Sequence, residues 1–396
     1  MAARHSRHRP AGPDPIHVRL NAAPGTASGA EAVSTSGPVV GGPRGRGSVR
    51  NASGRYEALA YAPPGEHGFE IGEEADLPPD RVETRLIPDA SRSVLARNTS
   101  PDIPFDRSVN PYRGCEHGCS YCYARPTHAY LGHSPGLDFE TQLYFKPDAA
   151  ALLEQTFRKP GYRVSPLGLG SNTDPYQPAE KALKITRSVL DVLAAFQHPV
   201  MVTTKGALVT RDIDILAPMA RCGIAKVALS VTTLNNRLAR AMEPRAPSPG
   251  RRLEAIRALS QAGIPTAVSM GPVIPGLNDH EIETLLEAAS DAGATAATYT
   301  LLRMPLEIKD LFRDWLEAAV PGRAARVISL MRQMRGGRDN DAQWHTRMTG
   351  EGPLAALIKA RFARSRRRLS LDSRGCILDT TRFAVPPRPG DQLRLL

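Results

Sequence analysis

The sequence contains few aromatic residues, few cysteines and no long apolar segment. Aromatic residues make up 5% of its 396 residues, while 35 prolines indicate many loops. No apolar run reaches the roughly 18 residues that span a bilayer, so we expect no membrane contact. The cysteines number five, which argues against a disulfide framework and favours a reducing, cytoplasmic compartment. No glycine fingerprint of a P-loop or a dinucleotide-binding turn is present, which argues against nucleotide binding of those kinds.

Positive charge is in excess, with a formal net charge of +11. Such an excess is typical of proteins that bind nucleic acid or anionic membranes. Residues 1–55 carry eight arginines against Asp14 and Glu31, so much of the excess belongs to one terminal segment. The stretch 361–370 is also basic, and it is either a phosphate-binding helix or a solvated helix face. DNA is therefore a candidate partner.

Composition divides the chain into four parts. Residues 1–55 are rich in Gly, Pro, Ser, Ala and Arg, and we expect a disordered basic tail there. A transit peptide would share the arginines, but the many prolines and glycines disfavour its amphipathic helix. Residues 56–104 form an irregular lead-in, residues 105–335 alternate strand and helix patterns, and residues 336–396 form a helical, basic extension.

The central part predicts an α/β fold. Short β-branched runs begin at intervals of 27 to 39 residues, the length of a βα unit. They lie at 164–170, 199–204, 226–232, 265–270 and 295–302. Helical periodicity fills the intervals, and Asn278 with Glu281 has the spacing of a capping box. With a first strand just before Cys115, about six βα units form a parallel sheet, either barrel-like or doubly wound.

Polar residues recur where the predicted strands end. In barrel enzymes these ends meet at one active face, so the recurrence predicts a site for a polar ligand. Ordinary turn chemistry is the alternative for each residue taken singly. The residues are Ser171, Asn172, Thr173 and Asp174 after the second strand, Thr204 and Lys205 after the third, Ser230, Thr232 and Thr233 after the fourth, and Arg303 after the sixth.

Three of the cysteines lie within eight residues. Cys115, Cys119 and Cys122 share a stretch with Gly114 and Gly118, so their thiolates can form a tripod around a soft metal centre. The residues alone leave three interpretations open. One is a zinc ion with His117 or His128 as fourth ligand; the second is a four-iron cluster with one iron left open; the third is plain thiols. The two other cysteines, Cys222 and Cys376, are too few to ligate an auxiliary cluster.

The stretch around these cysteines resembles the radical S-adenosylmethionine (SAM) superfamily. The spacing Cys-x3-Cys-x2-Cys, with Tyr121 before the last cysteine, carries the resemblance. Further blocks are similar to the DNA-repair-photolyase-like subgroup, which is related to spore photoproduct lyase. These blocks are SNTDPYQP at 171–178, SVTTLN at 230–235, MEPRAPSP at 242–249 and PVIPGLND at 272–279. The match extends over roughly residues 98–370.

The resemblance implies a partial (β/α)6 barrel of the TIM-like radical SAM type. Its implied cofactors are a [4Fe-4S] cluster on Cys115, Cys119 and Cys122, and SAM chelated to the open iron. Its implied activity is reductive cleavage of SAM to a 5′-deoxyadenosyl radical that abstracts hydrogen from a substrate, with DNA lesion repair as one candidate and an electron donor such as flavodoxin or ferredoxin. The implied SAM contacts are Tyr121, Ser171, Asn172, Thr173, Asp174, Lys205 and Ser230.

Two departures from the relatives stand out. The usual Gly-Gly-Glu is absent from the second-strand motif, and 168–176 lacks the cysteine that spore photoproduct lyase is understood to use as hydrogen donor. Repair of thymine lesions by that route is therefore doubtful, and no hydrogen donor is assigned. The alternative function is a zinc-stabilised nucleic-acid-binding protein without catalysis.

Overall fold

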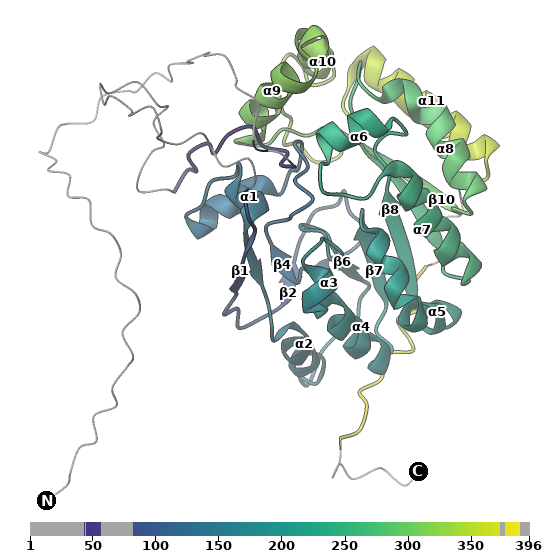
Figure 1. Cartoon of the computed structure of the whole chain (residues 1–396). Helices are drawn as coiled ribbons and strands as arrows, with labels where there is room; N and C mark the ends of the chain where they lie inside the picture. Colours follow the sequence, from purple (N-terminus) through teal and green to yellow (C-terminus); the bar gives the residue numbers. More distant parts are fainter. Residues whose placement is uncertain (1–42, 44, 57–81, 373–376, 389–396) are drawn as a thin grey trace, which may run out of the picture. The chain divides into compact units, whose positions relative to one another are not determined.

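Figure 1 shows the computed structural model of the chain, in which residues 43, 45–56, 82–372 and 377–388 are described. All of these residues belong to one unit, Val39–Leu396. Most of the predicted tail 1–55 and part of the lead-in 56–104 lie outside the described residues, as does Cys376. Residues 45–55 lie inside them and contact the body of the protein, as set out below.

The main sheet has seven strands in the order β10-β9-β8-β7-β6-β3-β2. Strands β3 and β6 to β10 pair parallel to their neighbours, whereas β2 pairs antiparallel at the edge. The predicted α/β class with six parallel strands is therefore confirmed. The bounds are β2 Leu95–Arg97, β3 Arg107–Val109, β6 Leu167–Leu169, β7 Val200–Thr204, β8 Ala225–Ser230, β9 Thr266–Val273 and β10 Ala296–Leu301.

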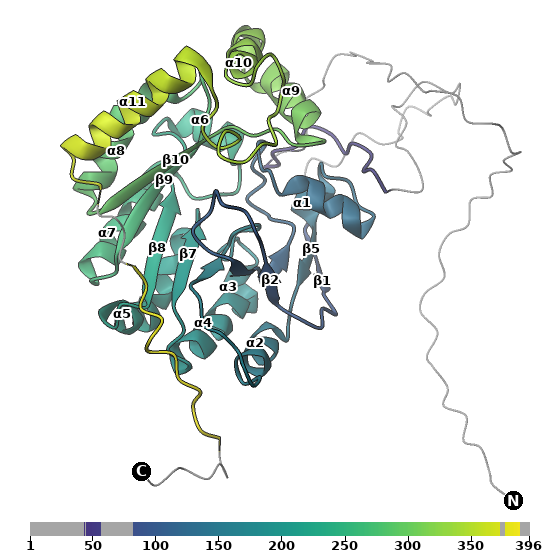
Figure 2. The same cartoon turned by 180° about the vertical axis from the view of Figure 1, so that it is seen from behind.

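Helices connect the parallel strands, as parallel pairing requires. Figures 1 and 2 show α4, α5 and α7 on one side of β7 and β8. The bounds between the strands are α2 Ala149–Phe157, α3 Glu180–Leu183, α4 Ile185–Ala195, α5 Ile213–Arg221, α6 Asn236–Met242, α7 Pro249–Gln261 and α8 Ile282–Asp291. Short 3₁₀ helices add η1 Arg125–Leu131, η2 Ala207–Asp212 and η3 Asp279–Glu281.

The core lies between the helices and the sheet. Along β7, β8 and β9 buried residues alternate with half-buried ones, because successive side chains point to opposite faces of a strand. On α4, Ile185, Val189 and Leu193 are buried together because their spacing places them on one helix face.

The first strand of the sheet ends earlier than predicted. It is β3, which stops at Val109, while the residues just before Cys115 form β4 (Tyr112–Arg113) in a separate sheet. That sheet has the order β1-β5-β4, with β1 at Arg85–Pro88 and β5 at Gln142–Phe145, beside the short helix α1 (Asp138–Thr141). The change of sheet occurs at Asn110-Pro111, where proline has no N–H to continue a ladder.

The predicted capping box is wrong. Asn278 makes no side-chain cap; its side chain binds the backbone of Ile274, Thr232 and Pro272. Glu281 accepts hydrogen bonds from the Thr233 hydroxyl and the Leu234 N–H. Both residues therefore fix the loops after β8 and β9 rather than the start of α8.

Three helices follow the last strand: α9 (Ile308–Ala319), α10 (Pro321–Gln333) and α11 (Gly352–Arg368). The basic stretch 361–370 lies largely on α11. Arg361 and Arg368 form ion pairs with Glu283 and Glu287 of α8, and Arg366 pairs with Asp372. These pairs favour the helix-face interpretation over the phosphate-binding one.

Candidate metal and cofactor site

The three clustered cysteines lie on a turn that two glycines permit. Gly114 and Gly118 have φ angles of +79° and +65°, a region that side chains rarely adopt. The turn is closed by two backbone hydrogen bonds, from Gly118 to Cys115 and from Cys122 to Cys119, each 3.3 Å. Cys115 and Cys119 are buried, and Cys122 is half-buried. We call residues 114–122 the cysteine loop.

A single glutamine holds the start of the cysteine loop. Gln177 is fully buried; its Oε1 accepts the Glu116 N–H at 2.9 Å, and its Nε2 donates to the Gly114 carbonyl at 3.3 Å. Its side-chain amide therefore binds the backbone on both sides of Cys115. The sequence analysis assigned no role to Gln177, although it lies in the block 171–178.

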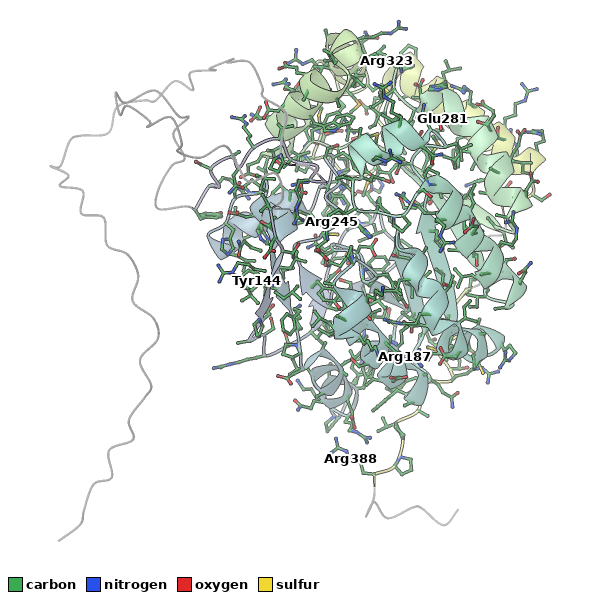
Figure 3. The ribbon with its side chains drawn as sticks, in the orientation of Figure 1. Tyr144, Arg187, Arg245, Glu281, Arg323 and Arg388 are labelled. Atoms are coloured by element: carbon green, nitrogen blue, oxygen red, sulfur yellow. The ribbon has the colours of Figure 1, made fainter. Side chains whose placement is uncertain are left out.

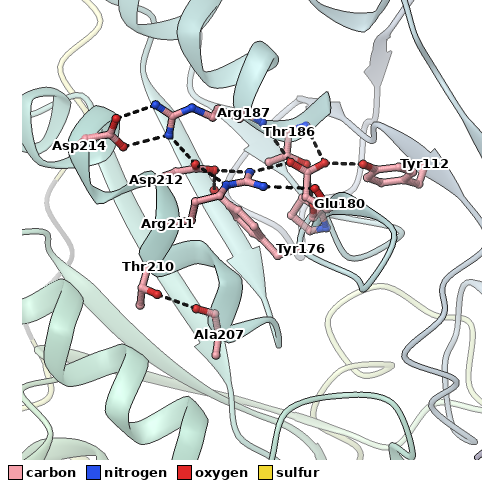
Figure 4. A network of polar contacts seen from close by, with 11 residues as sticks. Tyr112, Tyr176, Glu180, Thr186, Arg187, Ala207, Thr210, Arg211, Asp212 and Asp214 are labelled. Atoms are coloured by element: carbon pink, nitrogen blue, oxygen red, sulfur yellow. Dashed lines mark hydrogen bonds and ion pairs between the residues drawn. The ribbon is translucent and has the colours of Figure 1, made fainter. Parts of the chain in front are cut away.

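A buried ionic network around Glu180 and Asp212 is drawn in Figure 4. Glu180 and Asp212 are fully buried, and Arg211 bridges them at 2.7 and 2.8 Å. The Tyr112 hydroxyl donates to Glu180, and the Tyr176 hydroxyl donates to Asp212 at 3.0 Å. Tyr112 precedes the cysteine loop and Tyr176 follows Asp174, so the network fixes both segments.

The end of the second predicted strand contacts the segment that precedes the cysteine loop. The Thr173 hydroxyl donates to the Tyr112 carbonyl at 2.6 Å. The Asn172 N–H and the Ser171 hydroxyl bind the Asn110 side chain at 2.9 and 3.3 Å. All three residues thus brace the site through the protein's own groups, and their predicted contacts to SAM stay predictions.

Asp174 ties the ends of two strands together. Its carboxylate accepts from the Thr204 hydroxyl at 2.6 Å and from the Lys205 N–H at 2.7 Å, and it lies 3.3 Å from His117 Nδ1. Burial alone would raise the pKa of Asp174, but His117 and these hydrogen bonds outweigh it and hold the pKa well below its usual range. The carboxylate is therefore ionised, with both oxygens engaged. Its predicted contact to the SAM amino group stays a prediction.

A second charged group lies beside Cys119. Glu243 accepts hydrogen bonds from Tyr121, Thr232 and Arg252, and Arg252 also donates to the Ser230 carbonyl at 3.0 Å. Burial would raise the pKa of Glu243, but Arg252 and Lys205 lower it to about 2. The Tyr121 hydroxyl is thus held in the core. Neither Glu243 nor Arg252 was predicted as a site residue, although Glu243 lies in the block 242–249.

Lys205 is a second cation that acts on Glu243, after Arg252. Its Nζ lies 5.6 Å from the centre of the Tyr121 ring. Burial lowers its pKa, but Cys119 and Glu243 raise it more, so the net pKa is above the usual value. No carboxylate of the described residues lies within ion-pair distance of its ammonium group. Ser230, at the end of the next strand, donates from its hydroxyl to the Gly271 carbonyl at 3.3 Å.

Arg303, which follows β10, lies over the ring of Tyr123, just after the cysteine loop. Its guanidinium carbon lies 5.8 Å from the centre of the Tyr123 ring, next to Cys122. Tyr123 is 48% exposed, and its hydroxyl donates to the Ser171 carbonyl. The ends of the second, third and sixth predicted strands therefore do converge near the cysteines.

The chemistry of the donor set fits a cluster. Burial, Asp174 and the two other cysteines raise the pKa of Cys115, and burial with Glu243 and Cys122 raises that of Cys119 to about 12 despite Lys205. When a metal binds such thiols, their protons are released, and the positive charge of the metal stabilises the resulting thiolates. No group of three or more His, Cys, Asp or Glu side chains in the described residues is arranged as it would be around a metal ion, so the three thiols fit a cluster by residue type and by their place on one turn.

Two further predictions concern residues outside this group. Cys222 caps the end of α5 and precedes β8, so it lies at the amino end of that strand. No helix of the described residues is both long and apolar enough to cross a membrane.

Comparison with known proteins agrees with this geometry. Residues 109–289 match the radical SAM superfamily, and this range includes the cysteine loop and strands β6 to β9. The chain belongs to the radical SAM superfamily. It is similar to an uncharacterized protein of Mycobacterium tuberculosis (strain ATCC 25618 / H37Rv), with 39% identity over 58% of this chain and 68% of the relative.

Two further proteins are similar to this chain at lower sequence identity. An uncharacterized protein of Methanocaldococcus jannaschii is 28% identical over 44% of this chain and 62% of its own length. A solved structure of spore photoproduct lyase complexed with dinucleoside spore photoproduct has a TM-score of 0.51 at 15% identity, covering 72% of this chain and 79% of the lyase. At 15% identity, this likeness shows that the lyase and this chain share a fold.

Proposed function

We propose that this chain is a radical SAM enzyme that binds a [4Fe-4S] cluster through Cys115, Cys119 and Cys122. The observation that carries the proposal is the cysteine loop itself, with three thiols on one glycine-hinged turn inside the matched domain. When bound, the cluster and SAM supply one chemistry: an electron from the reduced cluster cleaves the S–C5′ bond, giving methionine and a 5′-deoxyadenosyl radical that takes a hydrogen atom from the substrate.

The chain's own residues bind and orient these groups. The Lys205 ammonium, with its raised pKa and no carboxylate partner among the described residues, supplies a fixed positive charge for the SAM carboxylate. Tyr121, whose ring centre lies 5.6 Å from the Lys205 ammonium, Ser230 and residues 171–174 are the further SAM contacts that we propose. In this proposal the electron comes from a one-electron donor of the flavodoxin or ferredoxin class. The cysteine count, which argues against a disulfide framework, supports a cytoplasmic location.

DNA lesion repair is the finer candidate for the reaction. It is supported by the resemblance of the motif blocks to spore photoproduct lyase and by the net charge of +11. The ion pairs of Arg361, Arg366 and Arg368 weigh against DNA binding through α11. A repair substrate would have to obtain its returning hydrogen from a group other than a cysteine at 168–176.

One observation favours the zinc-stabilised, non-catalytic alternative. His117 and His128 are both buried near the cysteine loop, and neither ring nitrogen of His128 has a hydrogen-bond partner among the described residues. The His128 ring packs against other rings instead. Its centre lies 5.6 Å from the centre of the Phe139 ring and 5.4 Å from the centre of the His133 ring. The His117 nitrogen Nδ1 faces Asp174.

Anaerobic purification and reconstitution test the proposal. We expect the full chain to be brown, to contain iron and sulfide near four per chain, and to form 5′-deoxyadenosine from SAM with a chemical reductant. Cys119→Ala should lose both iron and 5′-deoxyadenosine, while Cys222→Ala should keep both. One colourless zinc per chain, or a Cys119→Ala variant that still cleaves SAM, would refute the proposal. Deuterated candidate substrates, followed by label transfer into 5′-deoxyadenosine, would then identify the substrate.

A further inference from the structure

We propose that the cysteine loop has an outer wall made by residues 45–52, which lie outside the matched domain, and that Glu140 is the positioning residue that joins the two. We call residues 45–52 the N-terminal strap. The contacts that carry this proposal are all between groups of the protein itself and do not depend on a bound metal. Only the consequence for a cluster rests on the proposed function.

The strap packs directly on the backbone of the cysteine loop. A Cβ atom at Gly47 would lie 1.6 Å from the Gly118 carbonyl oxygen and 3.3 Å from the Ser120 nitrogen. Gly118 lies between Cys115 and Cys119. Only glycine permits so close an approach of two backbones, so Gly47 marks the point where the strap covers the loop.

Glu140 of α1 holds strap and loop together. It is fully buried, and its two oxygens accept the N–H groups of Gly47 and Ser48, each at 2.9 Å. Arg125, also buried, provides the neutralising cation. A Cβ at Gly118 would lie 2.6 Å from the same carboxylate, so Glu140 contacts both backbones. A buried carboxylate requires such partners, which makes the strap part of its solvation.

Further contacts anchor the strap before Gly47. Arg46 donates to the Thr84 hydroxyl at 3.1 Å, and that hydroxyl donates to Glu116 at 2.7 Å. Arg245, labelled in Figure 3, donates to the same Glu116 carboxylate at 2.9 Å. The N-terminal segment is thereby connected to the residue that follows Cys115.

The strap is also anchored after Gly47. Asn51 exchanges two hydrogen bonds with Asp138, at 2.9 and 3.1 Å, and Arg50 pairs with Asp314 of α9 at 2.6 Å. A Cβ at Gly136 would lie 2.4 Å from the Arg50 carbonyl oxygen. The strap therefore lies in close contact along several residues, and Cys115 and Cys119, on the loop whose backbone it touches, are only 7% and 8% exposed.

This arrangement gives the strap a protective role. Reagents in solvent reach a buried thiol, or a cluster bound to it, only when the covering segment opens locally. The strap is held mainly by hydrogen bonds to one carboxylate and by the side chains of Arg46, Arg50 and Asn51, so its opening should set the rate at which Cys115 and Cys119 become accessible.

Alkylation of the metal-free, full-length protein tests this. Iodoacetamide labelling, mapped by mass spectrometry, should be roughly tenfold faster at Cys115 and Cys119 in Gly47→Ala than in the unmutated protein, equivalent to about 1.4 kcal/mol of lost protection. Labelling of Cys222 should be unchanged. Gly250→Ala is the matched control, because no atom lies within 4 Å of its added Cβ.

A second variant covers the case in which Gly47→Ala unfolds, which faster labelling of Cys222 would reveal. Asn51→Ala removes the hydrogen bonds to Asp138 without touching the cysteine loop, and it should accelerate labelling of Cys115 and Cys119 to a smaller extent. Unchanged labelling of both cysteines in Asn51→Ala and in a folded Gly47→Ala would overturn the proposal.

The cluster gives an independent readout. In reconstituted protein, both variants should release iron to a chelator faster than Gly250→Ala does, in the same order as their alkylation rates. If the chain takes up no iron but the alkylation pattern holds, the proposed function fails and the wall stands. If iron is bound but the alkylation rates do not change, the wall fails and the proposed function stands.

Discussion

Replacing Gln177 with leucine should loosen the cysteine loop without filling or emptying its surroundings. Leucine has a similar volume but cannot bond to the Gly114 carbonyl or the Glu116 N–H. Each buried backbone group left without a partner costs about 1–3 kcal/mol, so two groups cost roughly 2–6 kcal/mol. Because leucine also removes a buried polar amide, we expect a net loss of about 2–4 kcal/mol.

Two measurements check this expectation. Urea unfolding of the metal-free protein gives the loss of stability, which should leave the variant folded if the parent has the usual margin of about 5–15 kcal/mol. Amide hydrogen exchange gives the local effect, because the Glu116 N–H loses its acceptor and should exchange faster. Gln155→Leu, on an exposed position of α2, is the control and should change stability by less than about 0.5 kcal/mol.

A Gln177→Leu variant that is as stable as Gln155→Leu, and whose Glu116 N–H exchanges no faster than in the parent protein, would refute the proposed role of Gln177. In that case the backbone on either side of Cys115 would be fixed by the turn alone. A stability loss without faster exchange at Glu116 would also contradict it, because the cost would then arise elsewhere in the core.

Two further predictions concern the charged groups at the strand ends. Lys205→Ala should weaken SAM binding at least about tenfold while iron content stays unchanged, since it removes a cation facing a carboxylate but no cluster ligand; equal SAM affinity in equilibrium binding would remove Lys205 from the site. The pKa of Glu243 is about 2 in the folded protein against an ordinary 4.5, so its ionisation stabilises the fold above pH 4.5, and this contribution is lost as the pH falls towards 2. Glu243→Gln should flatten the acid limb of stability plotted against pH; an acid limb as steep as that of the parent protein would show that Glu243 does not cause it.

The parallel sheet was predictable from the sequence because its signals are local. Buried strands such as β7 and β8 are short runs with Val at alternating or central positions among Met, Thr, Ala and Leu, and the helix between them has one apolar face. The same local reasoning failed at Asn278 and Glu281, where the spacing matched a helix cap. Both side chains bind loops that are distant in sequence, Thr232 and Thr233 included. Spacing alone does not record such partners.

Of the candidate site, the sequence predicted the cysteine ligands and the polar residues at the strand ends, but not the residues that hold them in place. The cysteine spacing is a local signal, and so are the polar residues at the strand ends. The residues that hold them in place are not, because Gln177, Glu140 and Glu243 each act on a partner more than 60 positions away or through a different element. Their buried polar side chains become informative only once burial is known, since a buried charge must be paired.

The strap is a segment whose order amino-acid composition does not predict. Residues 1–55 are too polar and glycine-rich to bury apolar surface, which is the physical basis for predicting disorder. Residues 45–52 are ordered by a different force: two N–H groups bind one buried carboxylate, and a glycine allows backbone to touch backbone. For such a segment, glycine is a requirement of the contact rather than a sign of flexibility. The boundary of the folded unit therefore follows the distribution of buried hydrogen-bond acceptors on the body, which composition does not reveal.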